Sequence, residues 1–156
     1  MANEKPWYET IVMPALLRHA RTIYGAAMHG ALADAGCDDV PKNGLYIIGG
    51  LALGAGGVPL GHLARELGVS KQAAGQLVDT LVLRGYLERA VDADDRRKLS
   101  VTLTERGRLA ASVQSAARAR IDAELLERVG AGPIAQTRRT LAALIEMRRT
   151  TETDEH

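Results

Sequence analysis

The sequence has no phenylalanine, and aromatic residues account for only 3% of its 156 positions. Alanine, leucine, valine and isoleucine must therefore fill any hydrophobic core. Hydrophobic residues still make up 46% of the chain and charged residues 25%, which is ordinary for a soluble globular domain. This length fits one domain with its own core and is short for two independent ones.

The sequence has a single cysteine and almost no net charge. The single cysteine, Cys37, excludes an intrachain disulfide and fits a reducing compartment, so we expect a cytoplasmic protein. Asp38 and Asp39 follow it, and neighbouring carboxylates disfavour a reactive thiolate, which favours an unreactive cysteine that is either structural or exposed. The net charge of +1 excludes a uniformly basic surface, so any nucleic-acid contact would depend on basic residues gathered on one face.

Signals for membrane insertion, metal binding and catalysis are also missing. The uncharged stretch 43–62 contains seven glycines and a proline, which favours a buried helix and a glycine-rich turn over a membrane span. His19, His29 and His62 are not at metal-ligand spacing. The sequence has no phosphate-binding glycine loop, nucleophile elbow or HExxH motif, so we expect neither an enzyme nor a cofactor.

Residues 58–104 carry the most informative pattern. Apolar residues at helical spacing predict a short first helix; they are Leu60, Leu63, Ala64 and Leu67. Gly68 then turns the chain, Ser70 can cap a second helix, and Gly85 follows its end. The second helix has an apolar stripe of Ala74, Leu77, Val78 and Leu81 and an opposite polar face of Lys71, Gln72, Gly75, Gln76 and Asp79. This is the helix-turn-helix pattern.

Two short strands are predicted next, over residues 86–89 and 99–103, with a charged loop between them. They form a two-stranded β wing, so the predicted class is mainly α with a winged helix-turn-helix over residues 41–107. Thr104 can cap the following helix, which should run to about Val129.

Long helices are predicted on both sides of this region. We expect one over residues 7–36, with Pro14 either starting or kinking its main part, another from Pro41 to about residue 53, and a last one over 133–150. The helix after the wing repeats apolar positions Leu109, Val113, Ala116, Ala117, Ile121, Leu125 and Val129. Such faces exceed what a small winged helix can cover, so residues 7–36 and 108–150 are predicted to form a helical dimerisation region in a homodimer.

The wing motif, DRRKLSVTLTERG from Asp95 to Gly107, resembles the D-x-R…L-T signature of the MarR family of bacterial transcription regulators. The resemblance covers roughly residues 16–148. It implies that Arg97 enters the DNA minor groove and that Asp95 holds its guanidinium. Arg96 and Lys98 are then phosphate contacts or solvent-facing charges.

The second helix of the motif is the candidate reading surface for double-stranded DNA. Ser70 and Lys71 stand at its start, Gln72 and Gln76 can pair with adenine, and Gly75 permits close approach. Asp79 could accept from cytosine, orient a neighbouring arginine or stay in water. Where the family often has a hydroxyl residue and then arginine, this chain has Gly75 and Gln76.

The resemblance also implies a small, often aromatic or phenolic, effector bound near the dimerisation helices. The candidate residues for it are His19, Arg21, Tyr24 and Tyr46. We therefore expect a ligand-responsive, sequence-specific repressor that binds a pseudo-palindromic operator as a homodimer. The alternative is a winged helix that serves as a protein-interaction module and does not bind DNA.

Overall fold

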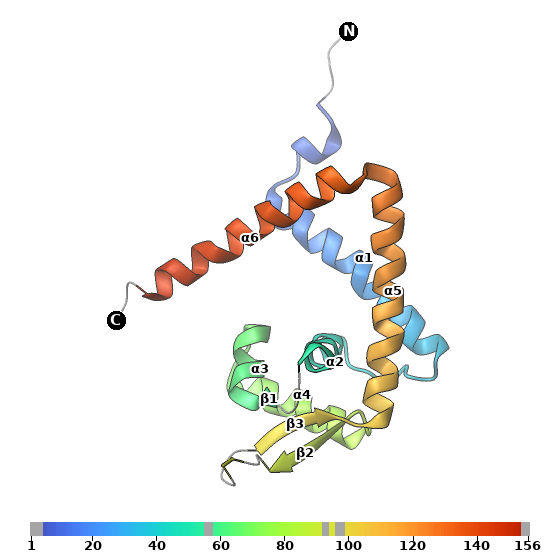
Figure 1. Cartoon of the computed structure of the whole chain (residues 1–156), viewed down its shortest axis with the longest axis vertical. Helices are drawn as coiled ribbons and strands as arrows, with labels where there is room; N and C mark the ends of the chain where they lie inside the picture. Colours follow the sequence, from blue (N-terminus) through green and yellow to red (C-terminus); the bar gives the residue numbers. More distant parts are fainter. Residues whose placement is uncertain (1–4, 55–57, 92–93, 96–98, 154–156) are drawn as a thin grey trace. The chain divides into compact units, whose positions relative to one another are not determined.

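The computed structural model describes residues 5–54, 58–91, 94–95 and 99–153. Its elements are η1 (Trp7–Glu9), α1 (Met13–Asp34), α2 (Gly44–Leu53), β1 (Val58–Pro59), α3 (Leu60–Leu67), α4 (Lys71–Leu83), β2 (Leu87–Val91), β3 (Leu99–Leu103), α5 (Glu105–Val129) and α6 (Ala131–Thr153) (Figure 1). The predicted fold, mainly α with a winged helix-turn-helix, is confirmed. The chain divides within α5 into two compact units, Met1–Arg118 and Ala119–His156.

The first long helix begins later than predicted. Instead of one helical stretch from residue 7, the 3-10 helix η1 stands apart and α1 begins at Met13. Pro14 lies in the first turn of α1, where its missing N–H removes no helical hydrogen bond. Proline therefore starts this helix and does not kink it.

The short helix η1 exposes its aromatic side chains. Trp7 is 67% exposed, and its ring meets the ring of Tyr8 edge to face with centroids 5.9 Å apart. Among the residues that the structure describes, the one buried aromatic side chain is Tyr86, far from Trp7 in sequence. The tryptophan side chain is therefore exposed to solvent, whereas the buried aromatic side chain is a tyrosine.

The sheet contains the predicted wing and one strand that was not predicted. β3 is central and pairs antiparallel with β2, from Leu87 opposite Leu103 to Val91 opposite Leu99. On its other edge β3 pairs with the two-residue strand β1, which precedes α3 directly. The wing hairpin is therefore joined to the start of the helix-turn-helix.

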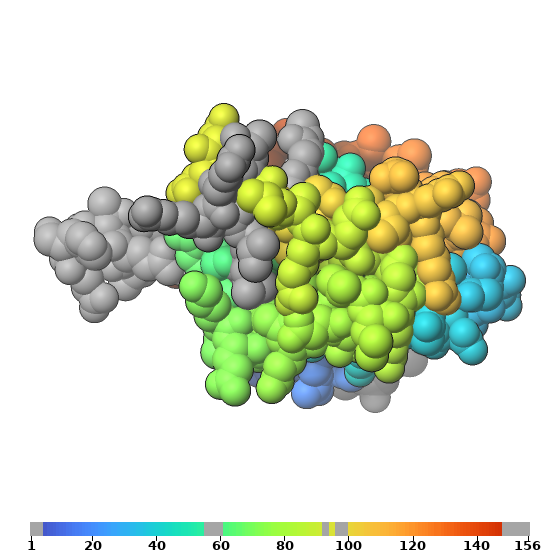
Figure 2. Space-filling view, turned by 90° about the horizontal axis from the view of Figure 1, so that it is seen from below, coloured from blue at the N-terminus to red at the C-terminus, as the bar shows by residue number. Residues whose placement is uncertain are grey.

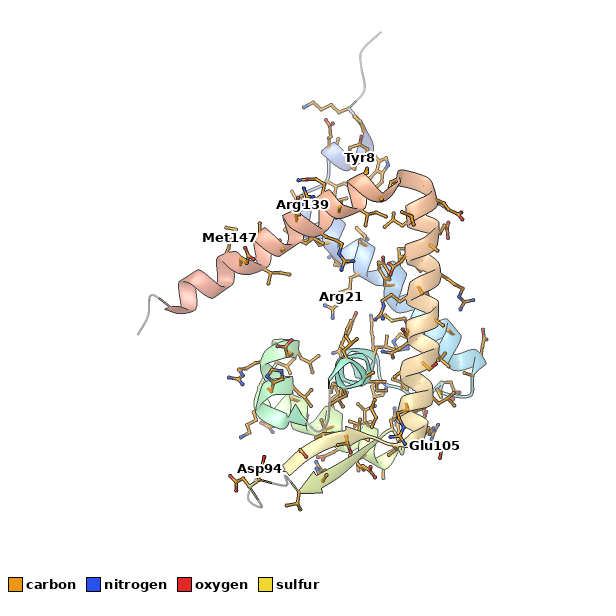
Figure 3. All side chains as sticks on the ribbon, in the orientation of Figure 1. Tyr8, Arg21, Asp94, Glu105, Arg139 and Met147 are labelled. Atoms are coloured by element: carbon orange, nitrogen blue, oxygen red, sulfur yellow. The ribbon has the colours of Figure 1, made fainter. Side chains whose placement is uncertain are left out.

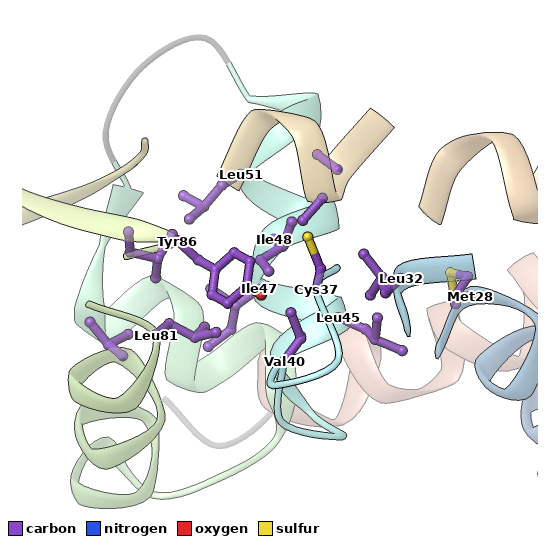
Figure 4. Close-up of a cluster of buried hydrophobic side chains, with 14 of the residues drawn as sticks. Met28, Leu32, Cys37, Val40, Leu45, Ile47, Ile48, Leu51, Leu81 and Tyr86 are labelled. Atoms are coloured by element: carbon purple, nitrogen blue, oxygen red, sulfur yellow. The ribbon is translucent and has the colours of Figure 1, made fainter. Parts of the chain in front are cut away.

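The core of the first unit lies around α2, which is buried on most sides. α2 begins at Gly44, after a turn in which Gly44 N donates to Pro41 O at 2.8 Å, and not at the predicted Pro41. Figure 4 shows the surrounding side chains. The largest fully buried ones are Tyr86, Leu32, Leu45, Ile47, Ile48, Leu81, Leu87 and Val78. Each contributes on the order of 1.5–3 kcal/mol of transfer free energy. Cys37 is 3% exposed within this cluster, as expected for a structural cysteine.

The face that α5 buries differs from the predicted one. The buried positions are small or polar: Gly107, Ala110, Ala111, Gln114 and Ala117. Leu109 is 52% exposed and Ala116 is also exposed, although both belong to the predicted apolar stripe. Close packing selects small residues here, because a side chain at Gly107 would collide with the main chain. Leu109, Leu125, Leu126 and Val129 are at least 40% exposed in the single chain, whereas Val113 of the predicted stripe packs partly buried against the core.

The second unit is a helical segment with exposed apolar side chains. Gly130, with a φ of +82°, ends α5, and α6 begins at Ala131, earlier than the predicted 133. Leu144, Ile145 and Met147 are each at least 47% exposed on α6. Within the described part of the chain, no helix has both the length and the apolar character needed to cross a membrane.

Candidate nucleic-acid interface

Helix α4 starts as the sequence predicts. Gly68, with a φ of +65°, turns the chain after α3, and Val69 N donates to Ala64 O at 3.1 Å. The Ser70 hydroxyl then accepts a hydrogen bond from Ala73 N at 3.1 Å. This N-cap satisfies an otherwise free backbone donor and fixes where the helix begins.

The two faces of α4 separate polar from apolar residues. Ala74, Val78 and Leu81 are at most 1% exposed and pack into the core. Leu77, which belongs to the predicted apolar stripe, is half-buried. On the opposite face Gly75 is half-buried, and the exposed predicted DNA-contacting residues are Ser70, Lys71, Gln72 and Gln76. Figure 2 looks onto the side of the molecule where α4 and β2 lie, in green to yellow-green. The exposed polar side chains of α4 are thus available to a partner.

An ion pair joins the outer face of α4 to the wing. Arg89 Nη2 on β2 donates to Asp79 Oδ1 on α4. Both side chains are partly exposed, 41% for Arg89 and 61% for Asp79. Of the roles considered for Asp79, the structure shows that of orienting a neighbouring arginine.

The tip of the wing is described only in part. Asp94 is exposed and Asp95 is half-buried, and both follow the end of β2. Arg96, Arg97 and Lys98, predicted to reach DNA, lie outside the described residues. Their roles therefore stay predictions. The strands that carry this tip are in place, because β2 and β3 pair along their whole length.

The base of the wing is held by the threonine and glycine of the L-T-E-R-G motif. The Thr104 hydroxyl accepts from Gly107 N at 3.0 Å, which caps α5, and donates to Gly85 O at 2.6 Å. A Cβ at Gly107 would lie 2.1 Å from Tyr86 O, so glycine is needed for this approach. The motif thus locks the α4–β2 corner against the β3–α5 corner.

A polar cluster that the sequence analysis did not single out lies at the same corner. We call it the Asp39 cluster; its members are Asp39, Arg84, Tyr86 and Arg106. Tyr86 Oη donates to Asp39 Oδ1, and Arg106 Nη2 lies 3.1 Å from the same oxygen. This hydrogen bond from Tyr86, assisted by the charge of Arg106, lowers the pKa of Asp39. Burial, together with the bond to Asp39, raises the pKa of Tyr86.

Two clefts flank the contact between α1 and α2. Arg21 Nε donates to Tyr46 Oη at 2.7 Å, and the guanidinium lies 4.2 Å from the tyrosine ring centre. Figure 3 shows Arg21 extending from α1. One cleft, of about 540 Å³, also includes Gln76 and Arg84; the other, of about 560 Å³, includes Arg18 and Lys42. Both have Arg21 and Tyr46 in their walls.

The other two predicted effector residues lie elsewhere. His19 is exposed and lines neither cleft, and Tyr24 is half-buried and packs against the core. The structure therefore brings together two of the four predicted effector residues. Among the described residues, no three histidine, cysteine or carboxylate side chains gather as a metal site would require.

Comparison with known proteins agrees with this arrangement. Residues 45–98 match the MarR family. RV1404 from Mycobacterium tuberculosis is 25% identical with a TM-score of 0.66, covering 92% of this chain and 95% of that one. A MarR-family transcriptional regulator from Rhodococcus sp. RHA1 is 23% identical with a TM-score of 0.69, covering 90% and 97%. A mutant of MepR from S. aureus, bound to an oligodeoxyribonucleotide, is 17% identical with a TM-score of 0.56, covering 88% and 98%. No curated protein matches the sequence.

Proposed function

We propose that this chain, whose residues 45–98 match the MarR family, is a transcriptional regulator that binds double-stranded DNA sequence-specifically and represses transcription. The observation that carries the proposal is the exposed polar face of α4. An ion pair between Asp79 of α4 and Arg89 of β2 connects this helix to the wing. A major groove about 12 Å wide admits a helix of this kind. The MepR mutant, solved with an oligodeoxyribonucleotide, supports a DNA partner for this fold.

Each exposed residue of α4 has a role in this proposal. Gln72 and Gln76 read adenine through paired hydrogen bonds, and Lys71 reaches guanine or a phosphate. Ser70 and Gly75 let the start of the helix approach the DNA closely. Asp79 is held by Arg89 and is therefore not available to accept from cytosine in the free protein.

The wing supplies the second contact. Arg97 enters the minor groove beside the major groove that α4 occupies, because a narrow groove has an enhanced negative potential. Asp95 orients Arg97, and Arg96 and Lys98 neutralise phosphates. Each phosphate contact releases counterions, so affinity should fall steeply as salt rises.

A homodimer accounts for the apolar side chains that the single chain leaves in water. These are Leu109, Leu125, Leu126, Val129, Leu144, Ile145 and Met147, all at least 40% exposed. Monomeric proteins rarely expose so much apolar surface in contiguous patches. We propose that residues 7–36 and 108–150 form the dimer region. Two copies of α4 related by a two-fold axis would then read a pseudo-palindrome with half-sites about 10 bp apart.

The clefts beside Arg21 and Tyr46 are the proposed effector site. A guanidinium over an aromatic ring suits a small aromatic or phenolic anion, because the cation pairs with the charge and the ring offers an apolar surface. Gln76 lines the cleft that also includes Arg84, so an occupant there would touch a residue of the reading face. Effector binding would thereby oppose DNA binding.

Gel shift with labelled duplexes tests the proposal. The probes are the gene's own upstream region and a shuffled duplex of the same composition, each across a salt series. We expect the upstream probe to bind more tightly, and Lys71→Ala to weaken both while Arg139→Ala, an exposed charge on α6, changes neither. Equal binding to both probes would contradict sequence-specific recognition, and binding to neither would favour a winged helix used as a protein-interaction module.

A further inference from the structure

The Asp39 cluster joins four parts of the chain that meet at the C-terminal end of α4. Asp39 lies in the loop between α1 and α2, and Arg84 is the C-cap residue of α4. Tyr86 directly precedes β2, and Arg106 lies in the first turn of α5. The side chain of Asp39 is thus the point where the α1–α2 loop meets the C-terminal end of α4 and the base of the wing.

Five contacts hold this arrangement. The Asp39 carboxylate accepts from Tyr86 Oη and from Arg106 Nη2. Arg84 Nη1 donates to the backbone oxygen of Asp39. Arg106 Nη1 donates to Arg84 O at 2.8 Å, and its guanidinium lies 4.4 Å from the centre of the Tyr86 ring. The carbonyl of the C-cap residue Arg84 therefore accepts from Arg106, a side chain that also donates to the Asp39 carboxylate.

The chemistry of the cluster makes its geometry specific. Tyr86 is fully buried, and a buried hydroxyl needs a hydrogen-bond partner. Arg106 donates from both arms of its fork, one to a carboxylate and one to a carbonyl, which fixes the plane of the guanidinium. Removing the carboxylate therefore leaves Arg106 and the Tyr86 hydroxyl without their common acceptor, whereas Arg84 keeps the backbone oxygen of Asp39.

We propose that Asp39 is a positioning residue for DNA recognition, which fixes the orientation of α4 from its C-terminal end. This inference rests on the proposed function. α4 is about 20 Å long, so a tilt of about 3° at the corner would move the Lys71 end by about 1 Å. A base-edge hydrogen bond tolerates a few tenths of an ångström, so such a tilt would misplace Gln72 and Gln76.

Specific and non-specific DNA binding respond differently to such a tilt. Non-specific affinity depends on phosphate charge and tolerates small displacements. Specific affinity depends on hydrogen bonds to base edges, which do not. The ratio of the two affinities therefore reports on helix orientation. A residue that only stabilises the fold would lower the unfolding midpoint and leave this ratio unchanged in protein that stays folded.

The test compares Asp39→Asn with Asp38→Asn. Asp38 is an exposed neighbour in the same loop, so both variants change the net charge equally. Affinities for the upstream duplex and for the shuffled duplex are measured by fluorescence anisotropy, at a temperature where circular dichroism shows each variant to be folded. We expect Asp39→Asn to lower the affinity ratio on the order of ten-fold, with unchanged salt dependence, and Asp38→Asn to leave the ratio at the wild-type value.

Tyr86→Phe keeps the test decisive if Asp39→Asn does not fold. It removes one hydroxyl and retains the ring under Arg106, so it should lower the ratio in the same direction by a smaller factor. A wild-type ratio in the folded Asp39 or Tyr86 variant would overturn the inference, as would an equal fall in Asp38→Asn. If wild-type protein bound both duplexes equally, the proposed function would fail and this inference with it.

Discussion

Asp79 on α4 and Arg89 on β2 form an ion pair that crosses from the reading helix to the wing. Both side chains are more than a third exposed, so water screens their attraction. We expect a double-mutant cycle with Asp79→Asn and Arg89→Ala, followed by urea unfolding, to give a coupling of about 0.2–1 kcal/mol that falls at high salt. The exposed helical pair Glu124–Arg128 is a control and should give about 0.3–0.5 kcal/mol. A coupling above about 2 kcal/mol would contradict the observed exposure.

Leu81 and Leu77 should differ in their contribution to stability. Leu81 is fully buried, whereas Leu77 is half-buried and lines the cleft beside Arg21. We expect Leu81→Ala to cost about 2–5 kcal/mol of unfolding free energy, as core deletions do, and Leu77→Ala less than about 2 kcal/mol. Denaturant unfolding measures both. Equal losses of unfolding free energy would contradict the different burial of Leu81 and Leu77, and with it the face of α4 that packs into the core.

Three glycines should respond differently to alanine. Gly107→Ala places Cβ 2.1 Å from the Tyr86 carbonyl oxygen, a main-chain atom, so it should cost about 3 kcal/mol or more. Gly49→Ala meets the end of the Gln114 side chain at 2.7 Å. Moving that side chain breaks its hydrogen bond to Leu45 O, at about 1–3 kcal/mol, against a gain in helix propensity of about 1 kcal/mol.

Gly30→Ala is the control for these two changes. Nothing lies within 4 Å of its added Cβ, and Gly30 is in α1, so this variant should gain about 0.5–1 kcal/mol. Thermal or urea unfolding of all three variants gives the order. A Gly107→Ala variant as stable as wild type would contradict the close approach at the wing base.

Arg97 and Gln76 should affect DNA binding in different ways. We expect Arg97→Ala to weaken operator binding by about 1–3 kcal/mol, with a larger loss where A·T-rich flanks narrow the minor groove. Gln76→Ala should relax preference at particular base pairs with little change in salt slope. Binding isotherms on operator variants separate the two. Arg139→Ala should change neither property, and an effect there equal to that of Arg97→Ala would show a general charge effect.

Acid should remove the contribution of Asp39 to stability. Its pKa is lowered in the folded protein, mainly because Tyr86 donates to the carboxylate, so the folded state favours the ionised form. That stability is present above the unfolded value, near pH 4, and is lost as the pH falls through the lower folded value. The difference in unfolding free energy between wild type and Asp39→Asn should therefore be constant from about pH 5 to 7 and shrink below about pH 4. A difference that grows on acidification would have the wrong sign.

The parts of the fold that the sequence predicted depend on local signals. Ser70, Gly85 and Thr104 act through neighbours a few residues away, so the ends of α4 and the start of α5 were predictable. β1 was missed because two residues carry no periodic pattern, and Pro59 is admitted to the sheet only at its edge. The stripe through Leu109 was misjudged because hydrophobicity ranks leucine above alanine, whereas close packing of α5 requires small residues.

The candidate site likewise contains some features that the sequence predicts and some contacts that it does not. The polar face of α4 follows from helical spacing, and an arginine partner was one of the roles foreseen for Asp79. The Asp39 cluster was not foreseen, because its contacts join residues 47 and 67 positions apart that belong to no motif. Arg21 and Tyr46, 25 positions apart, were expected near an effector from the family resemblance, but their contact with each other could not be predicted from spacing. Sequence periodicity reports neighbours along one element, and these contacts form between elements.

The exposure of Trp7 determines what the intrinsic fluorescence of this protein can report. The one tryptophan lies in η1, 67% exposed, whereas the buried aromatic side chain of the core is Tyr86. Melting the core would move the indole from one aqueous surrounding to another, so its emission maximum should barely change. A second subunit that covered η1 would shift the emission to shorter wavelength. Tryptophan emission in this chain is therefore a reporter of association at the N-terminal segment and a poor reporter of unfolding.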